Sequence, residues 1–240
     1  MVCLPQILGG IIMRVCVVIP TYNESKTIAG LIQQARSLGF EVVVIDDGSS
    51  DNTADIAATC KAQVLRNVKN LGKGAALAKG YNFALAQGFD AVISMDGDGQ
   101  HSCADLAVFM RKAESSGCGV IVGNRMAIIK QMPWLRVATN RFMSRLISKI
   151  TGQYIPDTQC GFRLIKKDLL RKLNLSTSKY ETESEILIQA ARLGFKIESV
   201  PVRTIYSGQK SRINPFVDSL RFLRFIIGTC RKGTPLSSVK

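Results

Sequence analysis

Hydrophobic and polar positions follow two alternating spacings along the first half of the chain. Residues 15–19 form a continuous apolar run, typical of a strand covered on both faces, and residues 28–38 place apolar side chains at helical spacing. The same succession predicts further strands at 41–45, 63–66 and 90–95 and helices at 53–60 and 73–87. Alternating strands and helices predict an α/β fold with a mostly parallel central sheet flanked by helices.

The second half has a less regular pattern. It predicts strands at 119–122 and 196–202, helices at 134–150 and 181–193, a loop through 157–163, and an amphipathic segment at 214–227. The chain contains no internal repeat and no low-complexity linker. We therefore expect one domain over residues 14–228, divided near residue 123, with an N-terminal extension at 1–13 and a basic tail at 229–240.

The N-terminal extension is apolar but too short and too irregular to cross a bilayer. It contains Pro5, Gly9 and Gly10, lacks a basic start, and offers Met13 as an alternative first residue. No other stretch reaches the roughly 18 uncharged residues that a spanning helix needs. The 7 cysteines form no CxxC pair, which favours reduced cytosolic thiols.

Positive charge is concentrated in two regions. The chain carries 32 Lys and Arg against 18 Asp and Glu, a net charge of +14. Residues 124–172 hold 11 basic and 2 acidic side chains, and residues 201–240 hold 8 and 1. This excess suggests an anionic partner. We do not expect nucleic acid, because the sequence has neither helix-turn-helix nor zinc spacing, lacks RNA-recognition aromatics, and contains one Trp.

Three polar turns follow the predicted strands: PTYNE at 20–24, DDGSSD at 46–51 and DGDGQH at 96–101. In a parallel sheet such turns meet beyond the carboxyl ends of the strands, where ligands bind. Asp96 and Asp98 would project into one small volume, and Mg²⁺ or Mn²⁺ would relieve their repulsion. The alternative for these two residues is an ordinary polar turn.

Two other positions have both a ligand and a structural interpretation. Asp47 can accept hydrogen bonds from a base or ribose, or it can close a turn. Lys73 begins a helix in NLGKG, where free backbone N–H groups and a lysine favour an anion, although the spacing is not that of a Walker motif. His101 is the only histidine, and the sequence offers no partners for a catalytic triad or a multi-histidine zinc site. We interpret it as a hydrogen-bonded neighbour of the DGDG turn, with a role as a metal ligand as the alternative.

Six motifs together resemble the family 2 glycosyltransferases with the GT-A fold. They are VVIPTYNE at 17–24, DDGSSDNT at 46–53, NLGKGAALAKG at 70–80, DGDGQH at 96–101, GNR at 123–125 and DTQCGFR at 157–163. The last two are similar to the branch that contains dolichyl-phosphate mannose synthases and bacterial polyprenyl-phosphate glycosyltransferases. The likeness runs in order from about residue 14 to residue 226.

The resemblance implies a role for each matching residue. It places Asp96, Asp98 and Gln100 at an Mg²⁺ or Mn²⁺ site and makes Arg125 and Arg212 donor-binding or phosphate-neutralising groups. It makes Asp157 a base or an electrostatic partner. The implied nucleotide-sugar-binding positions are Pro20, Tyr22, Glu24, Ile45, Asp47, Lys73, Asp96, Gly97, Asp98 and Arg125. Many relatives carry an arginine a few residues before the basic residue of the KSRI motif. This chain has no arginine at that position, so we do not expect the contact that the arginine makes in those relatives.

The implied reaction is inverting transfer of a sugar from a nucleoside diphosphate to a polyprenyl phosphate, either dolichyl or undecaprenyl. A lipid phosphate is already ionised near neutral pH, so Asp157 would orient groups or balance charge. With a hydroxyl acceptor on a saccharide or small molecule, Asp157 would be the general base. A nucleotidyltransferase is excluded because PTYNE is not a glycine- and arginine-rich loop.

Two predicted segments combine basic and apolar side chains, 134–150 and 214–227. Basic amphipathic helices with aromatic residues suit an anionic membrane interface, which predicts peripheral association with the cytoplasmic face of a membrane. The alternative is an ordinary helix whose apolar side packs on the core.

Overall fold

The computed structural model describes residues 13–128 and 132–205, and beyond them only Phe222, Phe225, Ile226 and Gly228. Residues up to Gly208 form one compact unit and residues 209–240 a second. Arg212, most of the segment 214–227 and the two terminal extensions lie outside the described residues. The predictions made for them, including the boundary at residue 228, stay predictions.

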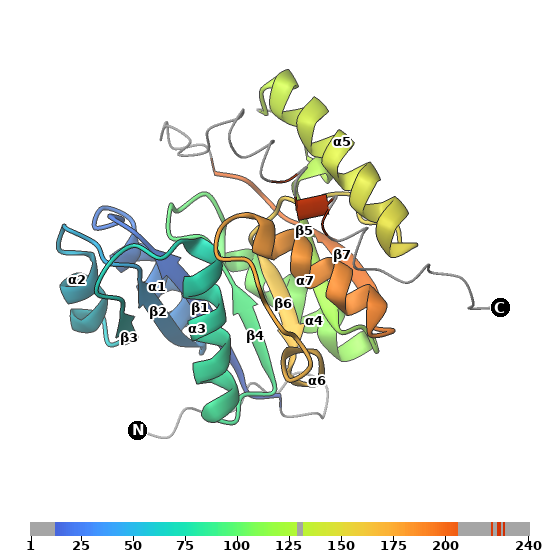
Figure 1. Cartoon of the computed structure of the whole chain (residues 1–240). Helices are drawn as coiled ribbons and strands as arrows, with labels where there is room; N and C mark the ends of the chain where they lie inside the picture. The colour runs from blue at the N-terminus through green and yellow to red at the C-terminus, as the bar shows by residue number, and fades with distance from the viewer. Residues whose placement is uncertain (1–12, 129–131, 206–221, 223–224, 227, 229–240) are drawn as a thin grey trace. The chain divides into compact units, whose positions relative to one another are not determined.

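A seven-stranded sheet forms the centre of the first unit (Figure 1). Its strands lie in the order β3-β2-β1-β4-β6-β5-β7, and β6 is antiparallel to both of its neighbours. Every other pairing is parallel, which confirms the predicted α/β fold class. The strands are β1 (Val15–Thr21), β2 (Glu41–Asp46), β3 (Gln63–Arg66), β4 (Ala91–Ser94), β5 (Val120–Asn124), β6 (Arg163–Lys166) and β7 (Ile197–Pro201).

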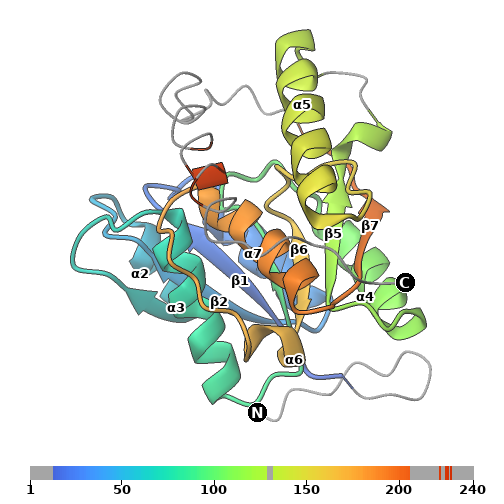
Figure 2. The same cartoon turned by 45° about the vertical axis from the view of Figure 1, so that its right-hand side comes forward.

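Helices cover both faces of this sheet (Figure 2). One face carries α1 (Ile28–Ser37), α2 (Thr53–Thr59) and α4 (Leu106–Ser115). The other carries α3 (Lys73–Ala86), α6 (Lys167–Leu170) and α7 (Glu181–Arg192), and α5 (Trp134–Thr151) packs against α7. Two short 3₁₀ helices complete the set, η1 (Cys103–Asp105) and η2 (Arg125–Ala127).

The apolar pattern explains these elements. All residues of β1 are buried, since β1 lies between β2 and β4 and helices cover its two faces, and this accounts for its uninterrupted apolar run. The helix α1 buries Ile28, Leu31, Ile32 and Ala35, which recur at helical spacing. The cysteines within the described residues are free thiols, as predicted.

The helix α5 buries three uncharged polar residues and one apolar residue. Its buried residues are Asn140, Ser144, Ile147 and Thr151, whereas Trp134 and Phe142 are exposed. The buried side of α5 thus includes polar residues together with Ile147, and the choice between membrane contact and core packing for this helix stays a prediction. Across the described residues, no helix combines the length and the hydropathy needed to cross a membrane.

Candidate active site

The polar turns that follow β1 and β4 pack directly against each other. A Cβ atom at Gly97 would lie 2.9 Å from Cγ2 of Thr21 and 3.4 Å from Cγ of Glu24, so only glycine permits this approach. The Oγ1 of Thr27 donates a hydrogen bond of 2.6 Å to the carbonyl of Gly97. The predicted convergence of PTYNE and DGDGQH beyond the strand ends is thus present.

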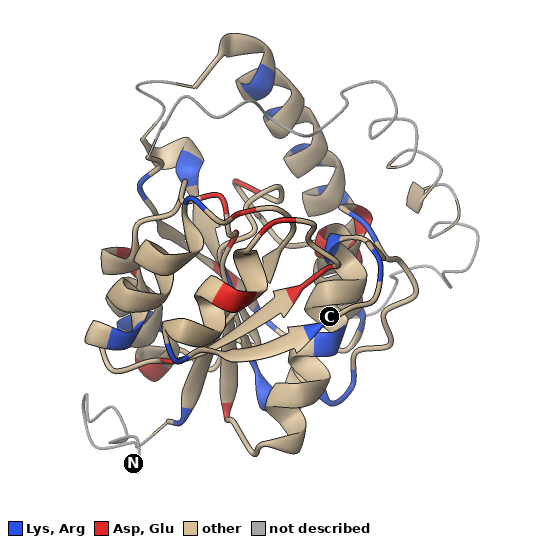
Figure 3. Ribbon diagram, turned by 90° about the vertical axis from the view of Figure 1, so that its left-hand side faces the viewer, with Lys and Arg blue, Asp and Glu red and all other residues tan. Residues whose placement is uncertain are grey.

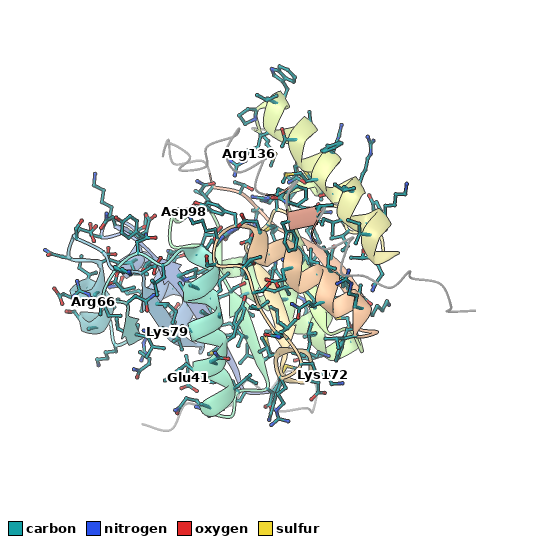
Figure 4. The ribbon with its side chains drawn as sticks, viewed as in Figure 1. Glu41, Arg66, Lys79, Asp98, Arg136 and Lys172 are labelled. Atoms are coloured by element: carbon teal, nitrogen blue, oxygen red, sulfur yellow. The ribbon has the colours of Figure 1, made fainter. Side chains whose placement is uncertain are left out.

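Charge is distributed unequally around these turns. Acidic residues gather in the loops beyond the carboxyl ends of the strands, and basic residues are spaced along α5 (Figure 3). Asp98 lies at the same end of the sheet as Arg136 on α5, while Glu41 and Lys172 lie at the opposite end (Figure 4). A ligand at the Asp98 end would meet both the acidic turns and the basic helix.

Asp96 is paired with a lysine. The Nζ of Lys73 lies 2.5 Å from Oδ1 of Asp96 and 2.7 Å from Oε1 of Glu183. Burial opposes the charged form of each group, but the mutual attraction prevails: it raises the pKa of Lys73 and lowers the pKa of Asp96. His101, packed against Phe162, places Nε2 3.6 Å from the other oxygen of Asp96.

Among the described residues, no Lys or Arg forms an ion pair with Asp98. Its Oδ1 accepts a hydrogen bond of 2.9 Å from the backbone N–H of Gln100. Burial and the neighbouring charge of Asp96 raise the pKa of the Asp98 carboxyl, which means that the ionised form is disfavoured where it stands. A divalent cation would reverse this situation, so the donor chemistry of Asp98 and Gln100 fits Mg²⁺ or Mn²⁺.

Among the described residues no group of three or more His, Cys, Asp and Glu could enclose a metal ion. Magnesium sites in proteins can use one or two carboxylates and take their remaining ligands from water and substrate phosphates.

Asp47 holds the NLGK loop. Its Oδ1 accepts hydrogen bonds from Nδ2 of Asn67 (2.8 Å) and the N–H of Leu71 (2.9 Å), and its Oδ2 accepts one from Gly72 (2.8 Å). The N–H of Ala75 donates to the carbonyl of Ser178. The backbone N–H groups of Leu71, Gly72 and Ala75 are thus engaged within the protein, and contact of Lys73 with the donor stays a prediction.

The other predicted nucleotide-binding residues differ in accessibility. Pro20 and Ile45 are paired in register across β1 and β2, and the Ile45 side chain is fully buried in the core near Gly80 of α3. Tyr22 is 38% exposed, and Glu24 is partly buried. The buried side chain of Ile45 therefore cannot contact a ligand, and Ile45 could do so only through its backbone.

A second charged cluster, around Asp157, is buried and hydrogen-bonded within the protein. Asp157 is 1% exposed and receives five hydrogen bonds. Three come from Arg125, through its backbone N–H, Nε and Nη2; the others come from Nδ2 of Asn140 (2.7 Å) and the N–H of Gln159. Burial opposes the ionised form of Asp157, but the Arg125 hydrogen bonds outweigh it and lower its pKa.

Sequence patterns missed three residues of these clusters. Asn140 lies within a helix whose basic and apolar residues are more prominent, and Glu183 looks like one of the acidic residues common in the first turn of a helix. Arg163 is 1% exposed and donates to the carbonyls of Cys160, Thr158 and Glu183. The one available signal was an arginine at the end of DTQCGF, directly before an apolar pair.

Comparison with known proteins identifies similar chains. The sequence model described as "Glycosyl transferase family 2" matches residues 16–173. A UDP-N-acetylglucosamine–dolichyl-phosphate N-acetylglucosaminyltransferase of Methanococcus voltae is 30% identical over 79% of this chain and 85% of its own. An undecaprenyl-phosphate mannosyltransferase of Micrococcus luteus is 31% identical over 79% and 83%.

The fold is similar to that of a solved enzyme structure. Glucosyl-3-phosphoglycerate synthase from Mycobacterium tuberculosis, in complex with Mn²⁺, UDP and glucosyl-3-phosphoglycerate, superimposes with a TM-score of 0.71. The match covers 95% of this chain and 82% of that one, at 23% identity. That protein is a GT-A enzyme, so the predicted GT-A fold is confirmed.

Proposed function

This chain belongs to glycosyltransferase family 2 and is therefore a glycosyltransferase, and from that premise we propose that it transfers a sugar, with inversion, from a nucleoside diphosphate to a polyprenyl phosphate. Membership of the family accounts for sugar transfer, and the proposal adds the polyprenyl phosphate acceptor. Two similar proteins bear the names of transferases that act on dolichyl phosphate and undecaprenyl phosphate.

The saturated state of Asp157 carries the proposal. A general base must accept a proton from its substrate at hydrogen-bond distance. Both oxygens of Asp157 are already occupied by donors from Arg125, Asn140 and Gln159, and its pKa is lowered. A phosphate oxygen requires no such base, because it is already ionised near neutral pH.

The hydroxyl-acceptor alternative is weaker for the same reason. To deprotonate a hydroxyl, Asp157 would have to release part of the Arg125 guanidinium in a site that is almost fully buried. Separating the partners of a buried ion pair leaves uncompensated charge and costs several kcal/mol. Asp157 is better suited to fixing Arg125 than to moving a proton.

A divalent metal fits the remaining requirement of the reaction. Sugar transfer leaves a nucleoside diphosphate whose developing charge Mg²⁺ or Mn²⁺ would stabilise. Asp98 and Gln100 would hold the ion, with Asp96 beside them. Arg125 would lie close to the same charge, oriented by its bidentate contact with Asp157.

The exposed side of α5 suits a lipid surface. Trp134 is 79% exposed, Leu135 60% and Phe142 61%, and Arg141 and Arg145 are exposed on the same helix. Aromatic and basic side chains combined on one helix favour an anionic membrane interface. A polyprenyl phosphate would be presented at such an interface.

A transfer assay with a donor panel tests the proposal. Labelled GDP- and UDP-sugars are incubated with polyprenyl phosphate in anionic vesicles, with Mg²⁺, Mn²⁺ or a chelator, and the organic-extractable label is counted. We expect label in the lipid only with metal. Metal-dependent consumption of the donor without any lipid product would overturn the proposed acceptor.

A further inference from the structure

Glu183 is connected through Lys73 to the DGD turn that follows β4. It sits in the first turn of α7, with its Oε1 2.7 Å from Nζ of Lys73, and its Oε2 lies 3.9 Å from Nη2 of Arg163. Lys73 bridges from Glu183 to Asp96, which follows β4. One lysine thus connects α7 to the DGD turn.

The helix that carries Lys73 has little freedom to move. A Cβ atom at Gly74 would lie 1.9 Å from Oγ1 of Thr182, and one at Gly72 would lie 2.5 Å from the carbonyl oxygen of Ser178. The two glycines of GKG therefore allow α3 to start in close contact with the segment that leads into α7. The stem of Lys73 begins from a fixed point between the two carboxylates.

Removing Lys73 from this position would leave the buried Glu183 carboxylate with Arg163, 3.9 Å from its Oε2, as its one ion-pair partner among the described residues. The Glu183 side chain is 7% exposed, and among the described residues no donor other than the Lys73 ammonium reaches its Oε1. A buried carboxylate without a donor is costly. The contacts therefore favour a lysine that stays in place over one that swings out to a phosphate.

We infer that Glu183 is a positioning residue, which fixes the Lys73 ammonium as a permanent cation against Asp96. Asp96 is then neutralised where it stands, and Asp98 is the carboxylate left to take a divalent ion. This inference rests on the proposed metal-dependent function and assigns the two aspartates different tasks. Asp96 anchors the turn to α3 and α7, and Asp98 binds the metal.

Direct Mn²⁺ binding tests the inference without relying on activity. Titrations are made by calorimetry on wild type, Lys73→Met, Lys73→Arg and Glu183→Gln, with and without GDP or UDP. Lys73→Met removes a like charge and releases Asp96, so nucleotide-free Mn²⁺ affinity should rise by about tenfold. Lys73→Arg keeps the charge and should bind Mn²⁺ as wild type does.

Glu183→Gln should act in the same direction as Lys73→Met, but more weakly. Without the Glu183 carboxylate the Lys73 ammonium is held less firmly against Asp96, so Mn²⁺ affinity should rise by about threefold. Because Glu183 acts through Lys73, the same substitution in the Lys73→Met background should change affinity little. Glu185→Gln is the matched control: Glu185 lies on the same helix and is also buried, but its carboxylate accepts hydrogen bonds from Ser176 and Thr177.

The possible results separate this inference from the proposed function. Unchanged Mn²⁺ affinity in Lys73→Met and Glu183→Gln, with wild type binding normally, would overturn the positioning role and leave the metal-dependent transfer standing. If Lys73→Met instead weakened GDP or UDP binding alone, Lys73 would be a donor ligand. Failure of wild type to bind Mn²⁺ even with nucleotide would overturn both.

Discussion

Two acidic clusters at adjacent positions of the sheet differ in how their carboxylates are paired and in the direction of their pKa shifts. Asp96 and Asp98 follow β4, and Asp157 precedes β6, which pairs with β4. Asp157 is enclosed by five donors and has a lowered pKa. Asp98 has a raised pKa, and the cation nearest to the turn is already committed to Asp96 and Glu183.

The difference separates scaffold from binding site. A buried charge that is fully hydrogen-bonded fixes its neighbours and offers nothing to a ligand. A carboxylate whose ionised form is disfavoured gains from any cation that arrives. The hydrogen-bonded Asp157 fixes the position of Arg125, and Asp98 is available to bind a metal ion.

Removing the open carboxylate should have the largest effect on catalysis. Asp98→Ala should lower sugar transfer by about a thousandfold, because the metal on the leaving diphosphate loses its ligand. Its melting temperature should not fall, since Asp98 makes no ion pair among the described residues. Asp55→Ala, at a surface position on α2, is the control; a fully active Asp98→Ala enzyme would refute the metal role.

Breaking the closed cluster should mainly affect stability. Asp157→Asn leaves the buried Arg125 guanidinium without its counter-charge, so the free energy of unfolding should fall by about 3 kcal/mol. Urea denaturation followed by circular dichroism measures this change. A variant as stable as wild type would show that the cluster is not the scaffold we describe.

The outer side of α5 should affect lipid binding and not stability. Replacing Trp134 and Phe142 together by serine should lower binding to anionic vesicles by about tenfold, because two exposed apolar side chains no longer enter the interface. Vesicle sedimentation measures this. Val68→Ser, at another exposed apolar residue, is the control; equal losses in both variants would argue against a specific role for α5.

The inner side of α5 should show a smaller effect on stability. Asn140→Ala removes one of the five donors to Asp157, and the free energy of unfolding should fall by about 1 kcal/mol. Thr139→Ala, the exposed neighbour on the same helix, is the matched substitution and should change stability less. Equal effects at the two positions would mean that the bond from Asn140 to Asp157 contributes nothing.

The dependence of stability on pH should have opposite signs at the two clusters. The lowered pKa of Asp157 adds stability that is present above its unfolded pKa and lost as pH falls through the folded value. The raised pKa of Asp98 makes the folded state bind protons more readily, so metal-free stability should fall as pH rises through that value.

Urea denaturation in chelator, between about pH 2 and about pH 7, resolves the two contributions, because the Asp157 contribution changes only below its unfolded pKa of about 3.9. Asp98→Asn should remove the loss of stability towards neutral pH, and Mn²⁺ should do the same in wild type. An unchanged pH profile in Asp98→Asn would show that Asp98 is not destabilised in the folded state.

Sequence patterns predicted the first half of the fold well. The strands β1 to β4 and the helices α1 to α3 lie where the spacing of apolar residues places them, because each packs one face or both on a single sheet. In the second half β6 was not predicted, and only its first residue, Arg163, fell in the loop predicted at 157–163. Its four residues start with the buried Arg163, and its antiparallel position between β4 and β5 depends on partners far away in the chain.

The parts of the site that lie in turns after strands could be predicted from the sequence. The parts whose role depends on burial and pairing could be predicted less well. The convergence of the turns at Asp96 and Glu24 follows from parallel strands alone. That Asp157 is closed, and that Lys73 is paired with Glu183, depends on contacts between residues distant in sequence. No local pattern distinguishes a buried, paired carboxylate from an exposed one.

The most direct test compares two acceptors that differ only in the phosphate. The enzyme, with its donor and Mn²⁺, is given a polyprenyl phosphate or the corresponding free polyprenol in identical vesicles, and the labelled lipid is measured. Because Asp157 is saturated and cannot serve as a base, we predict transfer to the phosphate and none to the alcohol. Equal transfer to the alcohol would contradict the account and make a general base necessary.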